Sequence, residues 1–396
     1  MIVGAGLAGC WLARLLAEDG VAVILLDEQT TVGCGASANP AGVVKPYVTR
    51  EPTKAMQFYL AAHEYLLHQL HALQLASVCD FKACGVLQLT RDAYPLSEHY
   101  QVLDIQKANQ SAGLPVGSHA LLFSLSGCLS PVSLCRALVQ HPLIHVRSNM
   151  QVHELHSTTV ADGQTCWHVK ASGAATQLTR HLVLANGHTL NQFEQTGHLP
   201  VIAARGQISR FRLMSNSPIP KKVISGRRYV IPDRDSVLVG ASFERNNSQR
   251  LICPREHEEN RRALMQLLPD IRVHAKAVDG FAGVRATTPD RLPLIGPVPN
   301  HARSNQVYAS LHHGRALSTY PRLPQLNGLF AIGGLGSRGI VTAPLAAQML
   351  ADFLLHKPSA KRQHSLIHWA SLCNPARFQI RALKRRYNRV MSGESK

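Results

Sequence analysis

The sequence has no closely spaced cysteine pair, no long apolar run and few acidic residues. Its nine cysteines are odd in number and form no CxxC pair, which argues against structural disulfides and a zinc site. No apolar run approaches the roughly 20 residues that span a bilayer, and no basic-then-apolar leader opens the chain. We therefore expect reduced thiols, no metal, no membrane span and a cytoplasmic location.

Acidic residues are scarce relative to basic ones. There are 24 Asp and Glu against 42 Lys and Arg, a formal net charge of +18. An enzyme that acts only on small molecules does not need this excess, whereas a polyanionic partner would explain it. The alternative is a solubility effect or a generally basic proteome.

A glycine motif opens the chain. Residues 1–3 form a short apolar strand that runs into Gly4, Gly6 and Gly9 in the spacing GxGxxG. The first glycine makes a tight turn, the second lets backbone approach a pyrophosphate, and the third lets the next helix pack closely. The helix N-terminus then offers N–H groups to the phosphates. The motif predicts a dinucleotide site, for NAD or FAD.

The stretch after the glycines fits the same interpretation. Residues 10–18 have the apolar spacing of a helix, and residues 21–26 form a buried strand that ends in Asp27. An acidic residue at about this distance binds the ribose of a dinucleotide. The strand before Gly4 is shorter than the usual length of about 5–6 residues. We therefore expect that the natural chain begins upstream or that another module precedes it.

Further elements follow along the chain. The loop 33–42 consists of small residues, with Ser37 and Asn39 as its polar side chains. Strands are predicted over 84–89, 121–126, 144–152 and 182–187, and helices over 51–73, 131–140, 255–268 and 343–355. Residues 201–280 alternate strands with turns, as in an antiparallel sheet. Residues 329–339 repeat the strand–glycine–helix pattern, which suits a dinucleotide held at both ends.

These elements predict an α/β protein with two interleaved domains. A Rossmann-like dinucleotide-binding domain comprises residues 1–75, 127–200 and 281–360. An antiparallel-sheet (α+β) substrate domain comprises residues 76–126 and 201–280. Residues 361–396 form a basic helical tail.

The motif order resembles the glycine oxidase and D-amino-acid oxidase family of flavoproteins. The matching pieces are the glycines 4–9, Asp27, Thr288-Pro-Asp290 with residues 292–296, and Gly333 to Gly336. The resemblance covers nearly the whole chain and implies FAD rather than NAD. Some relatives attach flavin covalently through a cysteine between positions matching Arg285 and Asp290. Because this chain has no cysteine there, we expect non-covalent FAD.

A narrower likeness is to the FAD-dependent C-terminal module of the MnmC family of bifunctional tRNA-modifying enzymes. It rests on residues 35–39, Gly42, 184–188, 206–209, 283–288 and 335–339. It implies removal of the carboxymethyl group from carboxymethylaminomethyl(-2-thio)uridine at the tRNA wobble position, giving aminomethyl(-2-thio)uridine and glyoxylate. The methyltransferase half of that family is missing from this chain, so a separate or fused methyltransferase module is a candidate partner.

Two alternatives stay open at this stage. One is a free glycine, sarcosine or D-amino-acid oxidase or dehydrogenase, and the other is a catalytically idle tRNA-binding flavoprotein. The sequence leaves open the electron acceptor, the tRNA species and the oligomeric state.

The resemblance also implies roles for single residues. Arg285 would clamp a substrate carboxylate, since a guanidinium binds a carboxylate through two hydrogen bonds. Arg338 is the second candidate cation, and Gln207 and Tyr229 are placed on the substrate face; a structural role is the alternative for each of the four. The expected cofactor contacts are Gly4, Gly6, Gly9, Asp27, Ser37, Asn39, Gly42, Val152, Ala185, Gly187, Gly333, Gly334, Gly336, Ser337, Arg338 and Gly339.

The C-terminal tail concentrates basic residues. A helix is predicted from residue 374, with Phe378, Ile380 and Leu383 available for docking. Its basic residues are Arg377, Arg381, Lys384, Arg385, Arg386 and Arg389. We expect these side chains to contact tRNA phosphates with a strong dependence on salt. The alternative is a solvated run of charge.

Overall fold

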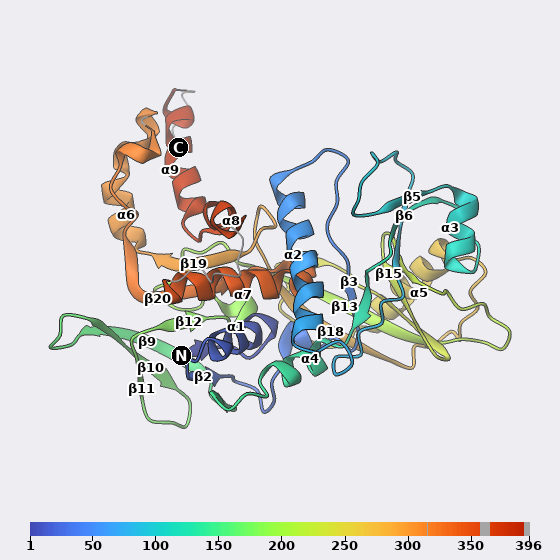
Figure 1. Ribbon diagram of the computed structural model, residues 1–396, viewed down its shortest axis with the longest axis horizontal. Helices are drawn as coiled ribbons and strands as arrows, with labels where there is room; N and C mark the ends of the chain where they lie inside the picture. The colour runs from blue at the N-terminus through green and yellow to red at the C-terminus, as the bar shows by residue number, and fades with distance from the viewer. Residues whose placement is uncertain (315, 357–364, 392–396) are drawn as a thin grey trace.

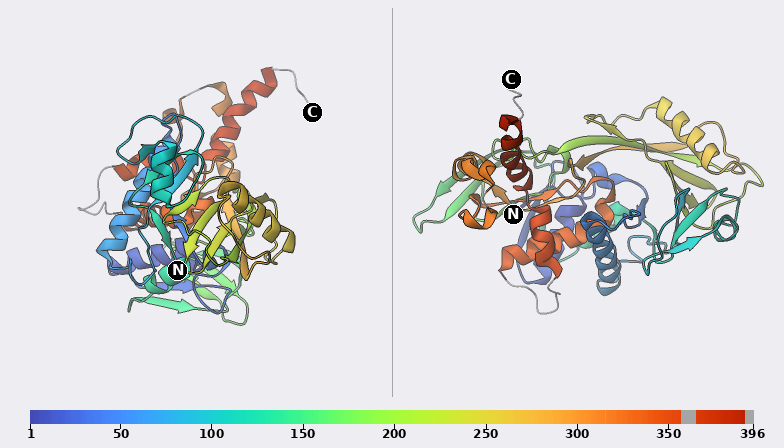
Figure 2. Two further views of the ribbon diagram at one scale, coloured as in Figure 1. Left: turned by 90° about the vertical axis from the view of Figure 1, so that its right-hand side faces the viewer. Right: turned by 90° about the horizontal axis from the view of Figure 1, so that it is seen from above.

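Two large sheets lie side by side along the long axis of the molecule (Figures 1 and 2). The computed structural model describes residues 1–314, 316–356 and 365–391. The first sheet has six strands in the order β19-β20-β12-β1-β2-β8. Its strands are β1 (Ile2–Val3), β2 (Val23–Leu26), β8 (Ile144–Arg147), β12 (Leu182–Leu184), β19 (Leu294–Pro299) and β20 (Gln325–Gly333). All neighbours pair in parallel except β19 with β20.

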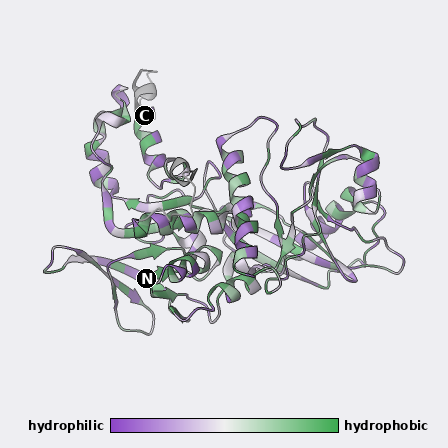
Figure 3. Cartoon of the chain, viewed as in Figure 1, coloured by the Kyte–Doolittle hydropathy of each residue, from purple (hydrophilic) through white to green (hydrophobic). Residues whose placement is uncertain are grey.

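Four helices pack on one face of this sheet. They are α1 (Leu7–Glu18), α2 (Lys54–Ala72), α4 (Pro131–Leu138) and α7 (Gly339–Leu355), and α7 contacts both α1 and α2. The sequence starts two of them by capping: Thr53 accepts from the N–H of Met56, and Ser130 accepts from Ser133 with Pro131 in the first turn. The apolar residues of α1 and α7 form the core with the strands (Figure 3).

Helix α7 corrects one expectation. Residues 336–355 form one stretch long and apolar enough to cross a membrane by length and composition, although the sequence was expected to contain no such run. Two thirds of this stretch, 67%, is buried inside the protein, as in the core helix of a globular domain. The stretch is therefore weak evidence for a membrane span.

The second sheet is predominantly antiparallel. Its order is β17-β13-β16-β15-β14-β4-β6-β5, and β18 pairs with the other edge of β13. The strands are β4 (Val86–Thr90), β5 (Gln101–Leu103), β6 (His119–Phe123), β13 (Ile202–Arg212), β14 (Val223–Ser225), β15 (Tyr229–Asp233), β16 (Ser236–Gly240), β17 (Glu244–Arg245) and β18 (Asp279–Thr287). Helices α3 (Ile105–Ala112) and α5 (Pro254–Leu267) cover one hydrophobic core of this sheet. Strands β13 and β18 pair antiparallel along most of their length, so residues that are far apart in the sequence lie directly opposite each other.

Two smaller sheets complete the fold. Strands β9 (Val152–Thr159), β10 (Thr165–Ala171) and β11 (Gln177–Thr179) form a separate antiparallel sheet, and β3 (Gly42–Val44) pairs with β7 (Gly127–Leu129). The single strand predicted over 144–152 is two strands, because the chain turns at Asn149, which has a positive φ of 58°. The strands of the two large sheets alternate along the chain, but β18 belongs to the antiparallel sheet although the expected boundary at 281 cut through it. The domain boundaries themselves stay a prediction.

The C-terminal helices pack against the rest of the protein. They are α8 (Ser365–Cys373) and α9 (Arg377–Met391), and α9 lies beside α6 (His301–Val307) and the short helix η3 (Ala309–His313) (Figure 1). Leu383 of α9 is buried against Tyr308 and Leu311. The residues predicted for docking, Phe378, Ile380 and Leu383, thus pack against the rest of the protein, and the separate region 361–396 stays a prediction.

Candidate active site

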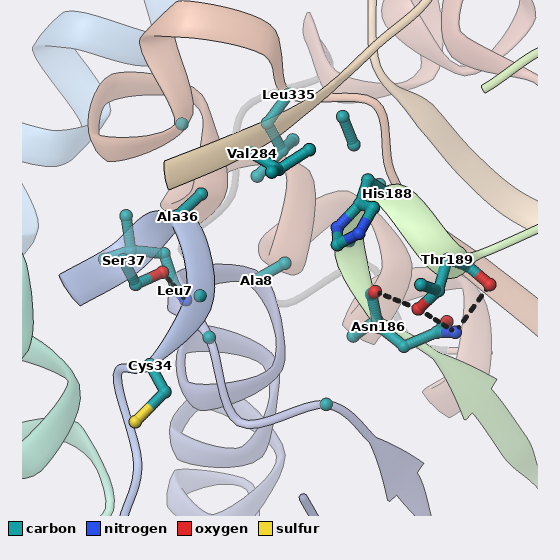
Figure 4. Close-up of a pocket in the computed structure, with 18 of the residues that line it drawn as sticks. Leu7, Ala8, Cys34, Ala36, Ser37, Asn186, His188, Thr189, Val284 and Leu335 are labelled. Carbon is teal, nitrogen blue, oxygen red and sulfur yellow. Dashed lines mark hydrogen bonds between the residues drawn. The ribbon is translucent and has the colours of Figure 1, made fainter. Parts of the chain in front are cut away.

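A cavity opens where the parallel strands β1, β2, β12 and β20 end. Its walls come from the glycine turn, the short helices η1 (Gly35–Ala38) and η2 (Gly187–Thr189), strand β18 and the turn after β20. Figure 4 shows Ala36 and Ser37 on one side and Asn186 and His188 on another, with Val284 and Leu335 nearby. A crevice at the carboxyl ends of parallel strands is the usual ligand position in such sheets.

The glycine turn leaves the N-terminus of α1 facing this cavity. Gly4 has a φ of 105°, and a Cβ there would lie 2.6 Å from the carbonyl oxygen of Ala185, so another residue does not fit. A Cβ at Gly9 would lie 1.9 Å from the carbonyl oxygen of Gly4, which explains the close packing of helix on strand. Gly6 precedes the helix without a side-chain cap. The first turn of α1 therefore presents N–H groups and a positive dipole end to a ligand.

Asp27 lies at the end of β2 and lines the cavity. Its carboxylate accepts hydrogen bonds from the backbone N–H groups of Ala5 (2.5 Å) and Gln29 (2.9 Å). Burial raises the pKa of Asp27, and these two bonds oppose that effect. The backbone bonds fix the carboxylate at the position where a ribose hydroxyl of a dinucleotide would lie.

Asn186 provides a test of whether a ligand fits. Its side-chain nitrogen donates to the backbone oxygen (2.9 Å) and the hydroxyl (3.1 Å) of Thr189, which fixes the orientation of the amide. Its Oδ1 is buried and has no hydrogen-bond partner among the described residues, and Asn186 is one of the residues that line the cavity. A buried acceptor without a partner is costly, so a ligand that donates a hydrogen bond here would satisfy it. The sequence reasoning did not single out this residue.

The predicted cofactor contacts divide into two groups. Those that line the cavity are Gly4, Gly6, Asp27, Ser37, Asn39, Val152, Ala185, Gly187, Gly333, Gly334, Gly336, Ser337 and Gly339. Gly9, Gly42 and Arg338 do not line it. Gly42 instead allows β3 to approach α7, because a Cβ there would lie 2.1 Å from Cδ1 of Ile340. We therefore correct its expected contact with the cofactor to a packing role.

Arg285 lies on β18 at the wall of the cavity. Its guanidinium lies over Gly206, where a Cβ would come within 2.2 Å of Nη1, and makes one long hydrogen bond of 3.4 Å to the backbone oxygen of Ser242. Within the described residues it has no carboxylate partner. Burial lowers its pKa from the ordinary value, but a guanidinium remains charged. Burial raises the pKa of the nearby Tyr229, and the charge of Arg285 opposes this shift.

Arg338 is held by aromatic rings. Its guanidinium carbon lies 4.8 Å from the ring centre of Tyr47 and 5.6 Å from that of Tyr59. Cation–π contacts of this kind hold a guanidinium without neutralising it. Lys45 is a further cation that the sequence analysis missed: burial, and then the charge of Arg338, lower its pKa to about 7. Its Nζ donates to Oε1 of Gln88 at 2.5 Å.

Gln207 does not face the site. Its side-chain oxygen accepts from the backbone N–H of Cys253 (2.7 Å), and its side-chain nitrogen donates to the backbone oxygen of the same residue (2.9 Å). Successive residues of a strand point to opposite faces, so Gln207 points away from the face that carries Gly206 and Arg285. Its amide positions the segment before α5, and the expectation of a substrate contact is wrong for this geometry.

The predicted phosphate-binding residues of α9 differ in their exposure to solvent. Arg377 is 5% exposed and makes two hydrogen bonds of 2.9 Å to the carboxylate of Asp290, which removes it from the expected basic face. Arg381 donates to Asp290 as well, at 2.6 Å, from a partly exposed position. Lys384 and Arg385 are exposed on the helix. The side chains of Arg386 and Arg389 lie outside the described residues.

Thiols and metal ligands add little to this site. All nine cysteines are free. Among residues 1–314, 316–356 and 365–391, no group of three or more His, Cys, Asp or Glu side chains is placed to hold a metal ion.

Comparison with known proteins decides what the cavity holds. The sequence profile of the family described as "DAO: FAD dependent oxidoreductase" matches residues 1–353. The chain belongs to this family of FAD-dependent oxidoreductases. The cavity residues fit FAD, because the glycine turn and Asp27 supply what its ADP half requires, and the unpartnered Oδ1 of Asn186 leaves one hydrogen-bond acceptor for a ligand.

Curated relatives of this FAD-dependent oxidoreductase are bifunctional proteins. The chain is 32% identical over 97% of its length to the "tRNA 5-methylaminomethyl-2-thiouridine biosynthesis bifunctional protein MnmC" of Pseudomonas syringae pv. tomato, and 30% identical over 96% to that of Legionella pneumophila (strain Corby). It covers 60% and 57% of those proteins, respectively. The chain thus spans about 60% of the length of the curated relatives it matches.

Solved structures share its fold. Glycine oxidase from Geobacillus kaustophilus superposes with a TM-score of 0.70 at 18% identity, covering 91% of this chain and 95% of that one. Iminodiacetate oxidase from Chelativorans sp. BNC1 gives 0.66 at 20% identity, covering 92% and 97%. These similarities agree with the predicted fold of a Rossmann-like domain interleaved with an antiparallel sheet.

FAD is predicted to be released intact on acid precipitation. Cys34 is the cysteine that lines the cavity, and it lies outside the Arg285–Asp290 segment, where a cysteine would have predicted a covalent bond to flavin. The yellow colour, measured as flavin absorbance, should appear in the supernatant after denaturation of the holoenzyme. Flavin absorbance retained in the washed pellet would contradict the prediction.

Proposed function

We propose that this FAD-dependent oxidoreductase oxidises the N-carboxymethyl group of carboxymethylaminomethyl(-2-thio)uridine at the tRNA wobble position, giving aminomethyl(-2-thio)uridine and glyoxylate. The observation that carries the proposal is Arg285, a largely buried guanidinium beside the FAD cavity without a carboxylate partner among the described residues. A substrate carboxylate would supply that partner.

The residues around Arg285 suit an amine that bears a CH2–carboxylate group. FAD, when bound, supplies a hydride acceptor for the CH2 carbon. Arg285 would hold the carboxylate, and Tyr229 beside it would limit the orientation of the amine. Arg338 and the nearly buried Lys45 add positive charge on the neighbouring side. The oxidised amine is an imine, which water splits into the primary amine and glyoxylate.

Charge and relatives support tRNA rather than a free amino acid as the substrate. The net charge of +18 has no use in binding glycine or sarcosine. Lys384 and Arg385 of α9 expose basic side chains that could contact phosphates. The curated relatives are described as tRNA 5-methylaminomethyl-2-thiouridine biosynthesis proteins. We propose that the methyl transfer implied by their bifunctional name is carried by another module or protein.

The test uses purified holoenzyme and tRNA that carries carboxymethylaminomethyluridine. Nucleoside mass spectrometry after incubation should show loss of this nucleoside and gain of aminomethyluridine, with one glyoxylate per converted residue. Turnover of free glycine, sarcosine or D-amino acids with unchanged tRNA would instead support a free amino-acid oxidase. Flavin that stays oxidised with every substrate under anaerobic conditions would indicate a catalytically idle tRNA-binding protein.

A further inference from the structure

Three neighbouring strands place Arg245 in line with Arg285. Arg285 on β18 is opposite Ala204 on β13, and Ala204 is opposite Arg245 on β17. Residues directly opposite each other on adjacent strands point to the same face of a sheet, and adjacent strands lie about 4.8 Å apart. The two arginines therefore share one face, with their backbones roughly 10 Å apart. Ala204, which lies between them in register, has a small side chain and is fully buried.

Phe243 lies on the same face as Arg245. The side chain of Ser242 points the other way, since its hydroxyl accepts from the N–H of Gln207 and donates to Glu256. Alternation along the extended segment then places Phe243 and Arg245 beside Arg285. Phe243 is 49% exposed, so its ring can be reached by a binding partner. Arg245 is exposed, and no hydrogen bond or ion pair joins its side chain to another described residue.

The segment that carries these side chains is held in place by contacts on the opposite face of the sheet. The buried pair of Arg205 and Glu256 lies under it, and Nη2 of Arg205 donates to the backbone oxygen of Leu251 at 2.5 Å. Gln207 holds both backbone groups of Cys253. Buried polar networks with all partners satisfied rigidify their surroundings. Phe243 and Arg245 are thus presented on a fixed support rather than on a free loop.

Arg245 is separate from the cofactor cavity. Arg250, a few residues further on, lines that cavity, and its guanidinium lies 3.8 Å from Glu28. Arg245 does not line the cavity, so its charge is available to a molecule approaching from solvent.

We propose that Phe243 and Arg245 form the surface that recognises the nucleotide part of an RNA substrate. Phe243 would stack on a base, and Arg245 would pair with a backbone phosphate. Aromatic stacking and arginine–phosphate contacts are the usual means of binding single-stranded nucleic acid. This inference rests on the proposed function: Arg285 binds the carboxylate that a free amino acid also has, whereas Phe243 and Arg245 bind groups that only the nucleic acid has.

The test compares two substrates in four variants of the holoenzyme: Phe243→Ala, Phe243→Trp, Arg245→Ala and the control Arg234→Ala. Arg234 is an exposed arginine of the same sheet, in the turn between β15 and β16. Steady-state oxidation is followed with carboxymethylaminomethyl-tRNA and with iminodiacetate, a small N-carboxymethyl amine. Phe243→Ala and Arg245→Ala should each raise KM for the tRNA about 10-fold, with iminodiacetate kinetics unchanged. Phe243→Trp should keep the parent's activity on tRNA, because the ring is still aromatic. Arg234→Ala should behave as the parent.

A second readout keeps the test independent of catalysis. The affinity of unmodified tRNA should fall in Arg245→Ala, with a log–log salt slope smaller by about 0.7–0.9, as for the loss of one phosphate contact. Failure of the parent enzyme to convert modified tRNA would reject the proposed function alone. Unchanged tRNA affinity and KM in both alanine variants would overturn the surface. The surface would also be overturned if the alanine variants lost as much activity with iminodiacetate as with tRNA, or if Arg245→Ala lost its FAD.

Discussion

Arg285→Lys should lower kcat/KM by roughly 10- to 150-fold for modified tRNA and for small N-carboxymethyl amines alike. The guanidinium can make two parallel hydrogen bonds to a carboxylate, whereas an ammonium acts as a compact point charge. Losing one charge-assisted hydrogen bond costs about 1.5–3 kcal/mol, which gives this range. Steady-state kinetics with both substrates measure the effect.

Comparing the two substrates distinguishes the role of Arg285 from the role of the surface formed by Phe243 and Arg245. The carboxylate is common to both, so Arg285→Lys should act on both, whereas Arg245→Ala should act on the tRNA alone. Far-UV circular dichroism and FAD content should stay at the level of the parent protein, because the long bond to Ser242 is the one hydrogen bond that the described structure gives this side chain. Unchanged kinetics with both substrates would remove Arg285 from the role of carboxylate clamp.

The parts of the site that the sequence predicted well depend on local chemistry. Gly4 requires a positive φ and has a backbone oxygen where a Cβ would lie, and Asp27 ends a strand at a fixed distance from the glycines. Such requirements are written in a short stretch of sequence, so a motif detects them. Arg285 was identified through the resemblance of residues 283–288 to a family motif, and its role as a carboxylate clamp stays a prediction.

The parts that the sequence did not predict depend on contacts between distant residues. Gln207 looked like a substrate contact, but its side chain binds the backbone of Cys253, 46 residues away. Arg245 acquires its place beside Arg285 only because β17 and β18 pair with opposite edges of β13. Gly42 looked like a cofactor contact, but it is small because Ile340 lies against it. Strand register and helix packing decide these roles, and neither is visible in a local pattern.

The basic tail illustrates the same point with charge. Arg377 and Asp290 are 87 positions apart, yet the guanidinium bonds both carboxylate oxygens, the backbone oxygen of Leu292 and the last carbonyls of α8. From the sequence alone, each arginine of the run is equally expected to be solvated or to bind phosphate. The fold selects Arg377 for the interior and leaves Lys384 and Arg385 outside. The C-terminal helix thereby supports the turn at residues 288–292 that follows β18.

Arg377→Ala should destabilise the protein by about 3–5 kcal/mol, because it leaves the partly buried carboxylate of Asp290 without its main partner. Burial alone would raise the pKa of Asp290, but the hydrogen bonds and charge of Arg377, and then Arg381, lower it to about 2. A carboxyl group with a lowered pKa stabilises the fold fully above its unfolded value of 3.8 and loses that contribution as the pH falls through about 2. The difference in unfolding free energy between parent and variant should therefore narrow between about pH 4 and pH 2.

Denaturant unfolding of the holoenzyme at several pH values measures this difference, with Arg381→Ala as the matched control. Arg381 binds the same carboxylate from a position that is 43% exposed, so its loss should cost no more than about 1 kcal/mol. Asp290→Asn combined with Arg377→Ala should cost less than the sum of the two single changes, since the pair is removed together. Equal, small losses for Arg377→Ala and Arg381→Ala would show that α9 does not hold the 288–292 turn, and the clamp by Arg377 would have to be abandoned.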